Sequence, residues 1–441
     1  MTKKRKPLPT EPVAADIESL SHDGRGVTHI DGKAVFVPAT LPGERVLFRY
    51  TRRARRHDEG VLLEVLTPAP QRVEPRCAHF GVCGGCALQH MDPAAQVHLK
   101  QTVLAETLTR IGRVEPARWL PPLAGAPWGY RRKARLGVRW VAKKGRVLVG
   151  FRERGSSFIA DLSHCDVLRP EVGARLPQLA ALIQSLSIRE RLPQIEVAQG
   201  DGPTVLVFRV LDPPTAADQD KLLAFAADTG LRVYLQPGGN ETVAPLPGQA
   251  VTLRYGLPEQ DIEIGFEPYD FTQVNLELNR LMLGQALDLL DPRADERVLD
   301  LFCGLGNFTL PIARRAGSVV GVEGDAGLVA RARRNAEHNR IGNVDFQCAD
   351  LYGEPTATAP WHRERFDKAL LDPPRSGARE VLDALAATGV RRLVYVSCYP
   401  ATLARDADHL VHELGFRLTA AGAMDMFPHT AHLESMALLE R

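Results

Sequence analysis

Three short segments in the last third of this chain bring together residue types that could catalyse group transfer. Cys398 ends the apolar run 393–397, Asp372-Pro-Pro-Arg375 follows another apolar run, and a glycine-rich turn lies at 303–308. Open parallel sheets place ligand chemistry at the carboxyl ends of their strands. The three segments therefore predict a thiol nucleophile beside a cofactor pocket. Taken alone, Cys398 would more often be a core residue, because cysteine is among the most buried residue types.

The glycine-rich turn Cys303-Gly-Leu-Gly-Asn-Phe308 resembles a dinucleotide-binding loop, but Thr309 stands where the third glycine should be. A dinucleotide brings a pyrophosphate to the helix N-terminus and needs glycines for close approach, whereas S-adenosylmethionine has no phosphate. The pattern therefore favours S-adenosylmethionine. Glu323, at the end of the next apolar run, has the spacing expected of a carboxylate that accepts from ribose hydroxyls, and Asp350 repeats this placement one strand later, near the adenine edge.

The Asp372 segment superficially resembles the Asp-Pro-Pro motif of adenine N6-methyltransferases, but Arg375 replaces their aromatic residue. An exocyclic amine needs no covalent catalyst, whereas C5 of uracil is a poor nucleophile that thiolate addition at C6 activates. Arg375 is the candidate cation that helps the thiol to ionise. Glu434 is the candidate base for the C5 proton, although its position is also typical of a surface glutamate. Asp300 and Asp372 would supply negative charge near a sulfonium, unless Asp300 only caps the turn.

A second set of cysteines forms a candidate metal site, comprising Cys77, Cys83, Cys86 and Cys165. Four soft ligands suit zinc or an iron–sulfur cluster. The spacing does not settle the metal, although a zinc knuckle normally contributes its ligands as two close pairs. Glycines 81, 84 and 85 permit tight turns around the ligands. The remaining two, Cys303 and Cys348, are associated with predicted strands and are predicted to be core residues.

The charge of the chain is divided unevenly along its 441 residues. Residues 1–150 contain 26 Lys and Arg against 13 Asp and Glu, and the rest contains 29 against 40. This asymmetry predicts a front end that binds a polyanion, with its densest clusters at 52–56 and 130–135. The basic start, 1–7, leads into a polar stretch without the apolar region of a secretory signal, and no run is long enough to span a bilayer. We therefore expect a cytoplasmic protein whose cysteines are reduced or bind metal.

Three patterns of secondary structure succeed one another along the chain. Short alternating segments at 10–69, with strands at 34–37, 45–50 and 60–65, predict a small antiparallel barrel of the oligonucleotide-binding kind. The stretch 75–267 mixes strands with helices at 94–111, 172–186 and 216–228, and is predicted to be an α+β domain. The apolar face of the first of these helices comprises Val97, Leu104, Leu108 and Ile111. From 268 to 441, strands and helices alternate regularly, which predicts a parallel, Rossmann-like sheet wound by right-handed crossovers.

The motifs together resemble the RNA uracil-C5 methyltransferases over nearly the whole chain. The resemblance is carried by Asp-Pro-Pro-Arg-x-Gly at 372–377, Leu-Val-Tyr-Val-Ser-Cys at 393–398, and Asp-x-Phe-Pro at 425–428 followed by His-x-Glu at 432–434. It implies that Cys398 is the nucleophile and Glu434 the base. It also implies a set of residues that bind S-adenosylmethionine or shape its pocket, namely Gln273, Phe302, Asn307, Glu323, Asp350 and Asp372. Tyr399 departs from the family, which usually has an amide residue there.

The basic barrel is similar to a TRAM domain, and the cysteine set resembles that of the branch acting on 23S ribosomal RNA. This resemblance implies a [4Fe–4S] cluster on Cys77, Cys83, Cys86 and Cys165, S-adenosylmethionine as methyl donor and 23S ribosomal RNA as partner, with no membrane and no obligate protein partner evident. The nearest alternative is a transfer-RNA uracil-C5 methyltransferase. A radical methylthiotransferase is disfavoured by the five-residue gap between Cys77 and Cys83, and a non-catalytic RNA chaperone by the intact Cys398 and Glu434 segments.

Overall fold

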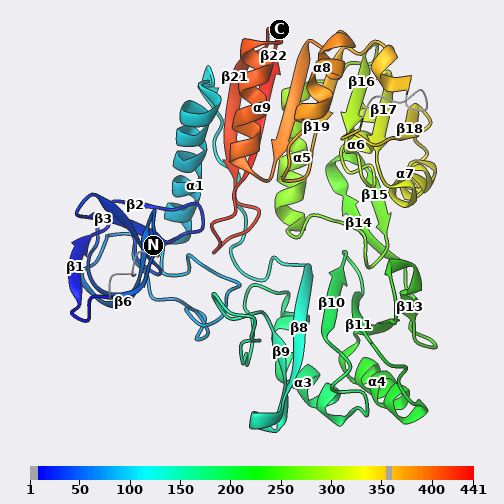
Figure 1. Cartoon of the computed structure of the whole chain (residues 1–441). Coiled ribbons are helices and arrows are strands. Elements are labelled where there is room, and N and C mark those ends of the chain that lie inside the picture. Colours follow the sequence, from blue (N-terminus) through cyan, green and yellow to red (C-terminus); the bar gives the residue numbers. More distant parts are fainter. Residues whose placement is uncertain (1–7, 354–359) are drawn as a thin grey trace, which may run out of the picture. The chain divides into compact units, whose positions relative to one another are not determined.

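The computed structural model describes residues 8–353 and 360–441 (Figure 1). The basic segment 1–7, on which the expected absence of a secretory signal depends, lies outside the described residues. The chain divides into two compact units. The first unit contains the described residues up to Lys100 together with Phe151–Ala160 and Phe427–His432, and the second unit contains the others. The predicted division into three domains, at 10–69, 75–267 and 268–441, stays a prediction.

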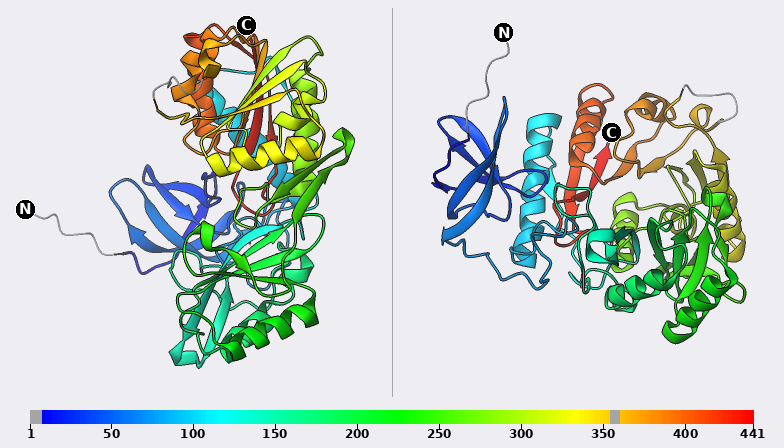
Figure 2. Two further views of the ribbon diagram at one scale, coloured as in Figure 1. Left: turned by 90° about the vertical axis from the view of Figure 1, so that its right-hand side faces the viewer. Right: turned by 60° about the horizontal axis from the view of Figure 1, so that its bottom comes forward.

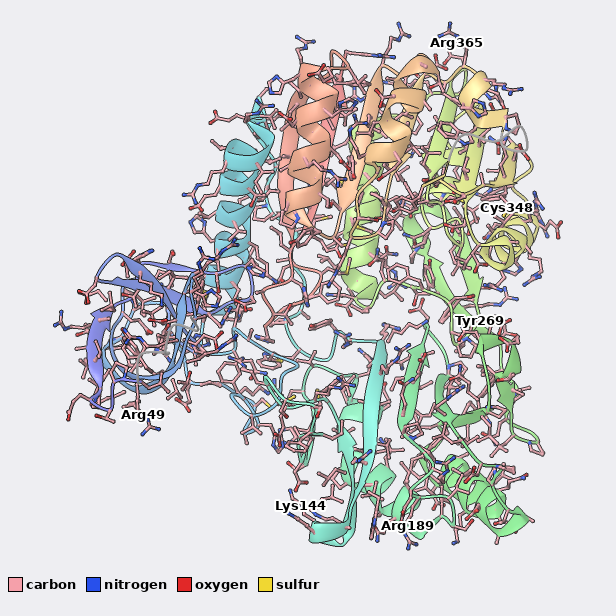
Figure 3. The ribbon with its side chains drawn as sticks, viewed as in Figure 1. Arg49, Lys144, Arg189, Tyr269, Cys348 and Arg365 are labelled. Atoms are coloured by element: carbon pink, nitrogen blue, oxygen red, sulfur yellow. The ribbon has the colours of Figure 1, made fainter. Side chains whose placement is uncertain are left out.

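The first unit is built on a six-stranded sheet of order β1-β5-β6-β4-β3-β2. The strands are β1 (Val13–Asp16), β2 (Ser19–Leu20), β3 (Gly26–Ile30), β4 (Lys33–Val37), β5 (Arg45–Arg53) and β6 (Asp58–Thr67). Alternate residues face a shared core that includes Val35, Val37, Phe48 and Tyr50. The pairing is antiparallel as predicted, except that β4 and β6 run parallel. Arg49, labelled in Figure 3, belongs to the outward-facing set of β5.

Helix α1 (Pro93–Thr107) begins in the first unit and continues into the second. It ends in a π-helical turn, Leu108–Gly112. Leu104 and Leu108 are buried as predicted, but Ile111 is 49% exposed. The prediction for Ile111 is wrong because a π turn contains more residues than an α turn, so it rotates the following side chains off the apolar face.

The second unit contains a six-stranded sheet of order β13-β12-β11-β10-β8-β9. Its strands are β8 (Lys133–Val141), β9 (Arg146–Gly150), β10 (Gln194–Gln199), β11 (Thr204–Arg209), β12 (Arg232–Gln236) and β13 (Ala244–Pro245), and helix α4 (Ala216–Thr229) packs on β12. The helix predicted at 172–186 is two helices, α2 (Pro170–Gly173) and α3 (Leu176–Ser185). Pro177 lacks the N–H that would bond to Gly173, whose carbonyl instead accepts from the Cys165 amide at 3.0 Å.

A second, eight-stranded sheet of this unit has the order β18-β17-β16-β19-β20-β22-β21-β7. Its strands are β7 (Arg118–Trp119), β16 (Arg297–Leu301), β17 (Ser318–Glu323), β18 (Val344–Cys348), β19 (Lys368–Leu371), β20 (Arg392–Ser397), β21 (Arg417–Met424) and β22 (Glu434–Glu440). The five strands from β18 to β20 are parallel as predicted. Strand β22 runs antiparallel between β20 and β21, and it begins beside the carboxyl end of β20.

Helices cover both faces of this sheet. Figure 1 shows α8 (Arg379–Ala387) and α9 (Pro400–His412) in front of it and α5 (Leu276–Leu290) behind it. Helix α6 (Thr309–Ala313) packs on β17, and α7 (Ala326–His338), yellow in Figure 2, packs on β17 and β18. The hairpin of β14 (Leu253–Leu257) and β15 (Ile262–Phe266) precedes α5. In the part of the chain that the structure describes, no helix has both the length and the apolar character that crossing a membrane requires.

Candidate active site

Cys398 and Glu434 lie at the same end of the eight-stranded sheet. Strands β20 and β22 are antiparallel neighbours in which Ser397 pairs with Ser435, so Cys398 follows one strand where Glu434 begins the other. The Ser435 hydroxyl donates to the Ser397 carbonyl at 3.3 Å, which fixes this register. Glu434 is 5% exposed, so it is not the surface glutamate that its sequence position also allowed.

The electrostatic environment of Cys398 favours the protonated thiol. Burial raises the pKa of Cys398 to about 11, with further contributions from the carboxylates of Glu434 and Asp372, whereas the Arg375 guanidinium acts in the opposite direction. The predicted effect of Arg375 therefore has the expected sign, but burial and two carboxylates outweigh it. All four side chains are close enough to interact electrostatically, which places the residues predicted for nucleophile, base and cation in one site.

The carboxyl groups of Asp300 and Asp372 lie near the carboxyl ends of the central strands. Burial raises the pKa of Asp300 to about 8 and that of Asp372 to about 7. The Thr309 hydroxyl donates to one oxygen of Asp300 at 2.6 Å, and the other oxygen has no partner among the described residues. Asp300 therefore bonds Thr309 at the start of α6, and a cation bound beside Asp300 would lower its pKa.

The glycine-rich turn connects β16 to α6 and lies against the end of β17. Phe302 adopts a left-handed backbone conformation with φ of 64°, a strained geometry for a bulky residue. Glu323 accepts hydrogen bonds from the amides of Gly304 and Asp325, each at 3.1 Å. These bonds hold its carboxylate at the mouth of the turn, where the sequence predicted it. Asp350 lies after β18 and accepts from the Tyr352 amide at 2.9 Å.

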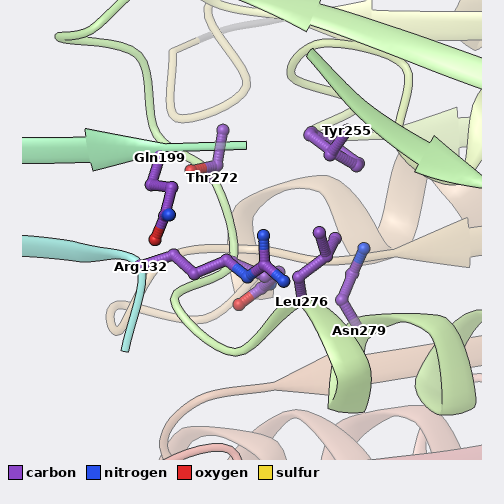
Figure 4. Close-up of a pocket in the computed structure, with 7 residues that line it drawn as sticks. Arg132, Gln199, Tyr255, Thr272, Leu276 and Asn279 are labelled. Atoms are coloured by element: carbon purple, nitrogen blue, oxygen red, sulfur yellow. The ribbon is translucent and has the colours of Figure 1, made fainter. Parts of the chain in front are cut away.

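Asn307 belongs to a hydrogen-bonded group that the sequence did not reveal. Its side-chain oxygen accepts from the Tyr255 hydroxyl and from the Asn279 amide, both at 3.0 Å, and its own amide donates back to Asn279. Tyr255 and Asn279 also line a pocket with Gln273, so the predicted residues Gln273 and Asn307 are joined through shared neighbours. Figure 4 shows this pocket, whose lining residues are Arg132, Gln199, Tyr255, Thr272, Gln273, Leu276 and Asn279. No periodicity or motif distinguishes Tyr255 from an ordinary strand residue.

Comparison with known proteins identifies the family of this chain. The family profile described as tRNA (Uracil-5-)-methyltransferase matches residues 249–441. The chain is 58% identical to the 23S rRNA (uracil(1939)-C(5))-methyltransferase RlmD of Alkalilimnicola ehrlichii, covering 100% of this chain and 99% of that protein. It is 56% identical to the RlmD of Methylococcus capsulatus, covering 99% of both chains. The chain belongs to the RlmD family.

A solved structure supports the fold of this RlmD-family chain. The Pyrococcus abyssi tRNA (uracil-54, C5)-methyltransferase, in complex with S-adenosyl-L-homocysteine, matches 97% of this chain and 99% of its own with a TM-score of 0.75. Its sequence identity is 23%, so the likeness concerns the fold. Membership of the RlmD family confirms the predicted resemblance and enzyme class. The roles assigned to individual residues stay predictions.

Tyr399 is the position at which this RlmD-family chain departs from the expected amide. It is the N-cap residue of α9, and its side chain makes no capping bond. Ser397 donates from its hydroxyl to the Tyr399 carbonyl at 3.1 Å and accepts from the Tyr399 amide at 3.2 Å. The loop after Cys398 is thus held by Ser397. Because residue 399 is a tyrosine and not a residue with a side-chain amide, α9 lacks a potential side-chain cap at this position.

The candidate metal ligands are divided between the two units. Cys77, Cys83 and Cys86 belong to the first unit and Cys165 to the second. Burial raises the pKa of Cys83, and a charge on Cys77 would raise it further. Within residues 8–353 and 360–441, no three His, Cys, Asp or Glu side chains form a group arranged to hold a metal ion. An iron–sulfur site is therefore not shown by the geometry.

The two cysteines predicted to be core residues differ. Cys303 is 5% exposed, as predicted. Cys348 is exposed at the end of β18, an edge strand of the sheet, and Figure 3 labels it. The prediction for Cys348 is wrong because a strand pattern does not reveal whether the strand lies at the edge of its sheet, where its end is accessible to solvent.

The two basic clusters also differ. In the cluster at 52–56, Arg55 and Arg56 are exposed, and their guanidinium groups have no ion pair to another described residue. In the cluster at 130–135, Tyr130 is buried, Arg132 pairs with Asp201 at 3.3 Å and Arg135 pairs with Glu196 at 2.8 Å. Arg52 of the first cluster pairs with Glu59 at 3.3 Å and Arg53 pairs with Asp58 at 3.5 Å, so each cluster is partly neutralised. The uncompensated positive charge of the first cluster is that of Arg55 and Arg56.

Proposed function

We propose that this chain transfers a methyl group from S-adenosylmethionine to C5 of a uridine in 23S ribosomal RNA, through a transient bond between Cys398 and C6 of the base. The single observation that carries the proposal is the β20–β22 register, which puts a thiol and a buried carboxylate at one strand end. The chain also belongs to a family whose named members act on uracil of 23S rRNA.

The reaction begins with the thiol of Cys398. Its proton must pass to solvent water before attack, because the thiolate is the nucleophile, and burial together with two carboxylates favours the thiol. The sulfonium of S-adenosylmethionine adds positive charge near Asp372, which offsets the carboxylates that disfavour ionisation. The thiolate sulfur then forms a bond to C6 of uracil, and the electron pair of the C5–C6 double bond moves onto the base as an enolate.

The enolate accepts the methyl group, and Glu434, acting as general base, completes the reaction. C5 attacks the methyl carbon, the bond from that carbon to the sulfonium sulfur breaks, and S-adenosylhomocysteine is released. Glu434 then accepts the C5 proton, the C6–sulfur bond breaks, and the thiolate returns to Cys398. Arg375 is positioned to stabilise either the thiolate or the enolate oxygen, because its charge already acts on the Cys398 sulfur.

The methyl donor is proposed to bind along the carboxyl ends of β16, β17 and β18. Glu323 would accept from the ribose hydroxyls and Asp350 would lie near the adenine. Gln273 and Asn307 would bind the amino-acid end, because both adjoin the pocket that Tyr255 and Asn279 line. Phe302 would shape the pocket, and Asp372 would lie beside the sulfonium.

We propose that ribosomal RNA also contacts the first unit. The TRAM-like barrel carries Arg55 and Arg56, exposed and unpaired within the described chain, and phosphate groups are their natural partners. The target uridine must leave its stack to reach Cys398. We propose that the reaction takes place in the cytoplasm, where thiols stay reduced.

A [4Fe–4S] cluster on Cys77, Cys83, Cys86 and Cys165 is part of the proposal. Its support is the donor chemistry, since Cys77 lies close enough to Cys83 to influence its pKa, and Arg154 lies near enough to both Cys83 and Cys86 for their charges to act on it. When bound, the cluster would supply structural cross-linking through thiolate bonds. Cys83→Ser is expected to lose iron and sulfide and to unfold at a lower temperature. Retained fold and RNA affinity in the cluster-free variant would refute the structural role.

The experiment that tests the proposed function measures transfer of a labelled methyl group from S-adenosylmethionine. The substrates are 23S ribosomal RNA and transfer RNA from a strain that lacks this gene. We expect 5-methyluridine at one position of 23S ribosomal RNA and none in transfer RNA. Cys398→Ala should give no product with either RNA. Methylation of transfer RNA alone would favour the alternative substrate, and full activity of Cys398→Ala would overturn the mechanism.

A further inference from the structure

A buried aspartate contacts two segments of the candidate active site but is not itself one of the site residues. Asp406, on helix α9, is 0% exposed. One of its oxygens accepts from the Tyr395 hydroxyl and from the Ala378 amide, both at 2.7 Å. Its other oxygen accepts from the Arg405 guanidinium at 2.8 and 2.7 Å. Burying a carboxylate is costly unless such partners satisfy it, so this arrangement requires an explanation.

The partners of Asp406 come from three segments that meet at the site. Tyr395 lies on β20, three residues before Cys398. Ala378 follows the Asp372 segment, three residues after Arg375. Helix α9, which carries Asp406 itself, begins at Pro400, two residues after Cys398. One carboxylate therefore connects the strand before the nucleophile, the helix after it and the loop that carries the cation.

The loop is fitted closely against this carboxylate. Gly377 has φ of 84°, and a Cβ atom added there would lie 2.6 Å from an Asp406 oxygen and 2.6 Å from Arg405. Arg405 also donates to the Ser376 carbonyl at 2.9 Å. The Tyr352 hydroxyl donates to the Gly377 carbonyl at 3.1 Å. The backbone at 376–378 is thus held by bonds from α9 and from Tyr352.

We propose that Asp406 is a positioning residue that holds the loop carrying Arg375 against the strand carrying Cys398. The Arg375 side chain is exposed and makes no hydrogen bond or ion pair to another described residue. Its place relative to the Cys398 sulfur is therefore set by its backbone, which Asp406 anchors at Ala378. The inference rests on the proposed function in one respect, that Cys398 is the nucleophile.

The charged groups that act on the Cys398 sulfur come from three elements. Glu434 lies on β22, Asp372 follows β19, and Arg375 lies in the anchored loop. Of these, Arg375 alone favours the thiolate, so a displaced loop should leave the thiol more protonated. A role of Asp406 confined to stability would lower the unfolding temperature without changing thiol ionisation in the folded protein.

The test compares Asp406→Asn and Tyr395→Phe with the wild-type protein. Asparagine keeps an acceptor but loses the charge that binds Arg405, and phenylalanine removes only the hydroxyl. The readout is the rate at which iodoacetamide alkylates Cys398 as a function of pH, followed by mass spectrometry of its peptide. We expect alkylation near pH 8 to fall about threefold in Asp406→Asn and by a smaller factor in Tyr395→Phe. We also expect the change in kcat, a decrease, to be larger than the change in KM for the RNA.

A double-variant comparison shows whether Asp406 acts through Arg375. Arg375→Gln alone should slow alkylation, and adding Asp406→Asn should slow it little further. Asp408→Asn is the matched control, because it removes an ion pair with Arg113 at 2.7 Å from the same helix and leaves the loop bonds intact. This control should alkylate at the wild-type rate.

Wild-type alkylation in folded Asp406→Asn and Tyr395→Phe, or fully additive effects with Arg375→Gln, would overturn the inference. Because alkylation needs no RNA or methyl donor, it is measured even when turnover is absent. Failure of the proposed function would show as turnover in Cys398→Ala, a separate result. If Asp406→Asn does not fold, the outcome is decided by Tyr395→Phe alone and by the double variant that combines Tyr395→Phe with Arg375→Gln.

Discussion

Glu434→Gln is expected to make the Cys398 thiol more acidic while it stops turnover. Burial, Glu434 and Asp372 raise the pKa of Cys398 to about 11, so removing the charge of Glu434 should lower that pKa. At pH 8 the thiolate fraction would rise from about one in a thousand to about one in a hundred. Alkylation of Cys398 by iodoacetamide should therefore be about tenfold faster at this pH.

The same variant should fail at the step after methyl transfer. Glutamine cannot accept the C5 proton, so the covalent complex between protein and RNA should accumulate, and turnover should fall by a factor of about 10² to 10⁴. The assay follows the Cys398 peptide by mass spectrometry from pH 7 to pH 10 and the covalent complex by denaturing electrophoresis. The two measurements separate the electrostatic effect of Glu434 from its role as base.

Glu440→Gln is the matched control for this prediction. It removes a carboxylate from the same strand, β22, where Glu440 pairs with Arg392 at 2.9 Å. Alkylation of Cys398 and formation of the complex should match the wild type. An unchanged alkylation profile in Glu434→Gln would refute the electrostatic reasoning, and normal turnover in that variant would refute the assignment of the base.

Three other expectations concern the methyl-donor side of the site. S-adenosylmethionine should accelerate alkylation of Cys398 relative to S-adenosylhomocysteine, because only the former carries the positive sulfonium; equal rates with both ligands would contradict the electrostatic coupling. Tyr255→Phe removes the 3.0 Å bond to Asn307 and should weaken binding of S-adenosylmethionine several-fold by calorimetry, with little change in affinity for RNA. Burial raises the pKa of Asp300 to about 8, so the folded protein retains a proton that the unfolded chain releases above about pH 4. This difference lowers the free energy of unfolding progressively as pH rises from about 4 to 8, and Asp300→Asn should flatten that decline and raise Tm at pH 8.

Local patterns revealed most of the sheet but little of its edges. The five parallel strands were predictable because apolar residues recur within each of them and a turn or a polar residue follows. The antiparallel return of β22 depends on pairing with β20, a long-range contact that periodicity does not encode. For the same reason, the sequence did not show that Cys348 ends an edge strand or that a π turn at 108–112 exposes Ile111.

The residue types of the site were predictable from the sequence, but their net electrostatic effect on Cys398 was not. The residue types of Cys398, Asp372 and Arg375 indicated a nucleophile and a cation, and the structure places them within electrostatic reach. That burial and two carboxylates outweigh Arg375 required the three-dimensional arrangement. Tyr255 carried no signal, since its role depends on meeting Asn307, fifty-two residues further along the chain.

Trapping on RNA that contains 5-fluorouridine tests the covalent bond to Cys398 most directly. Fluorine at C5 cannot be removed by Glu434, so wild-type protein with S-adenosylmethionine and a 5-fluorouridine fragment of 23S ribosomal RNA should form a stable complex. Mass spectrometry of that complex should locate the RNA on the peptide containing Cys398, and Cys398→Ala should form none. A complex linked through another residue, or an equal yield from Cys398→Ala, would contradict the account.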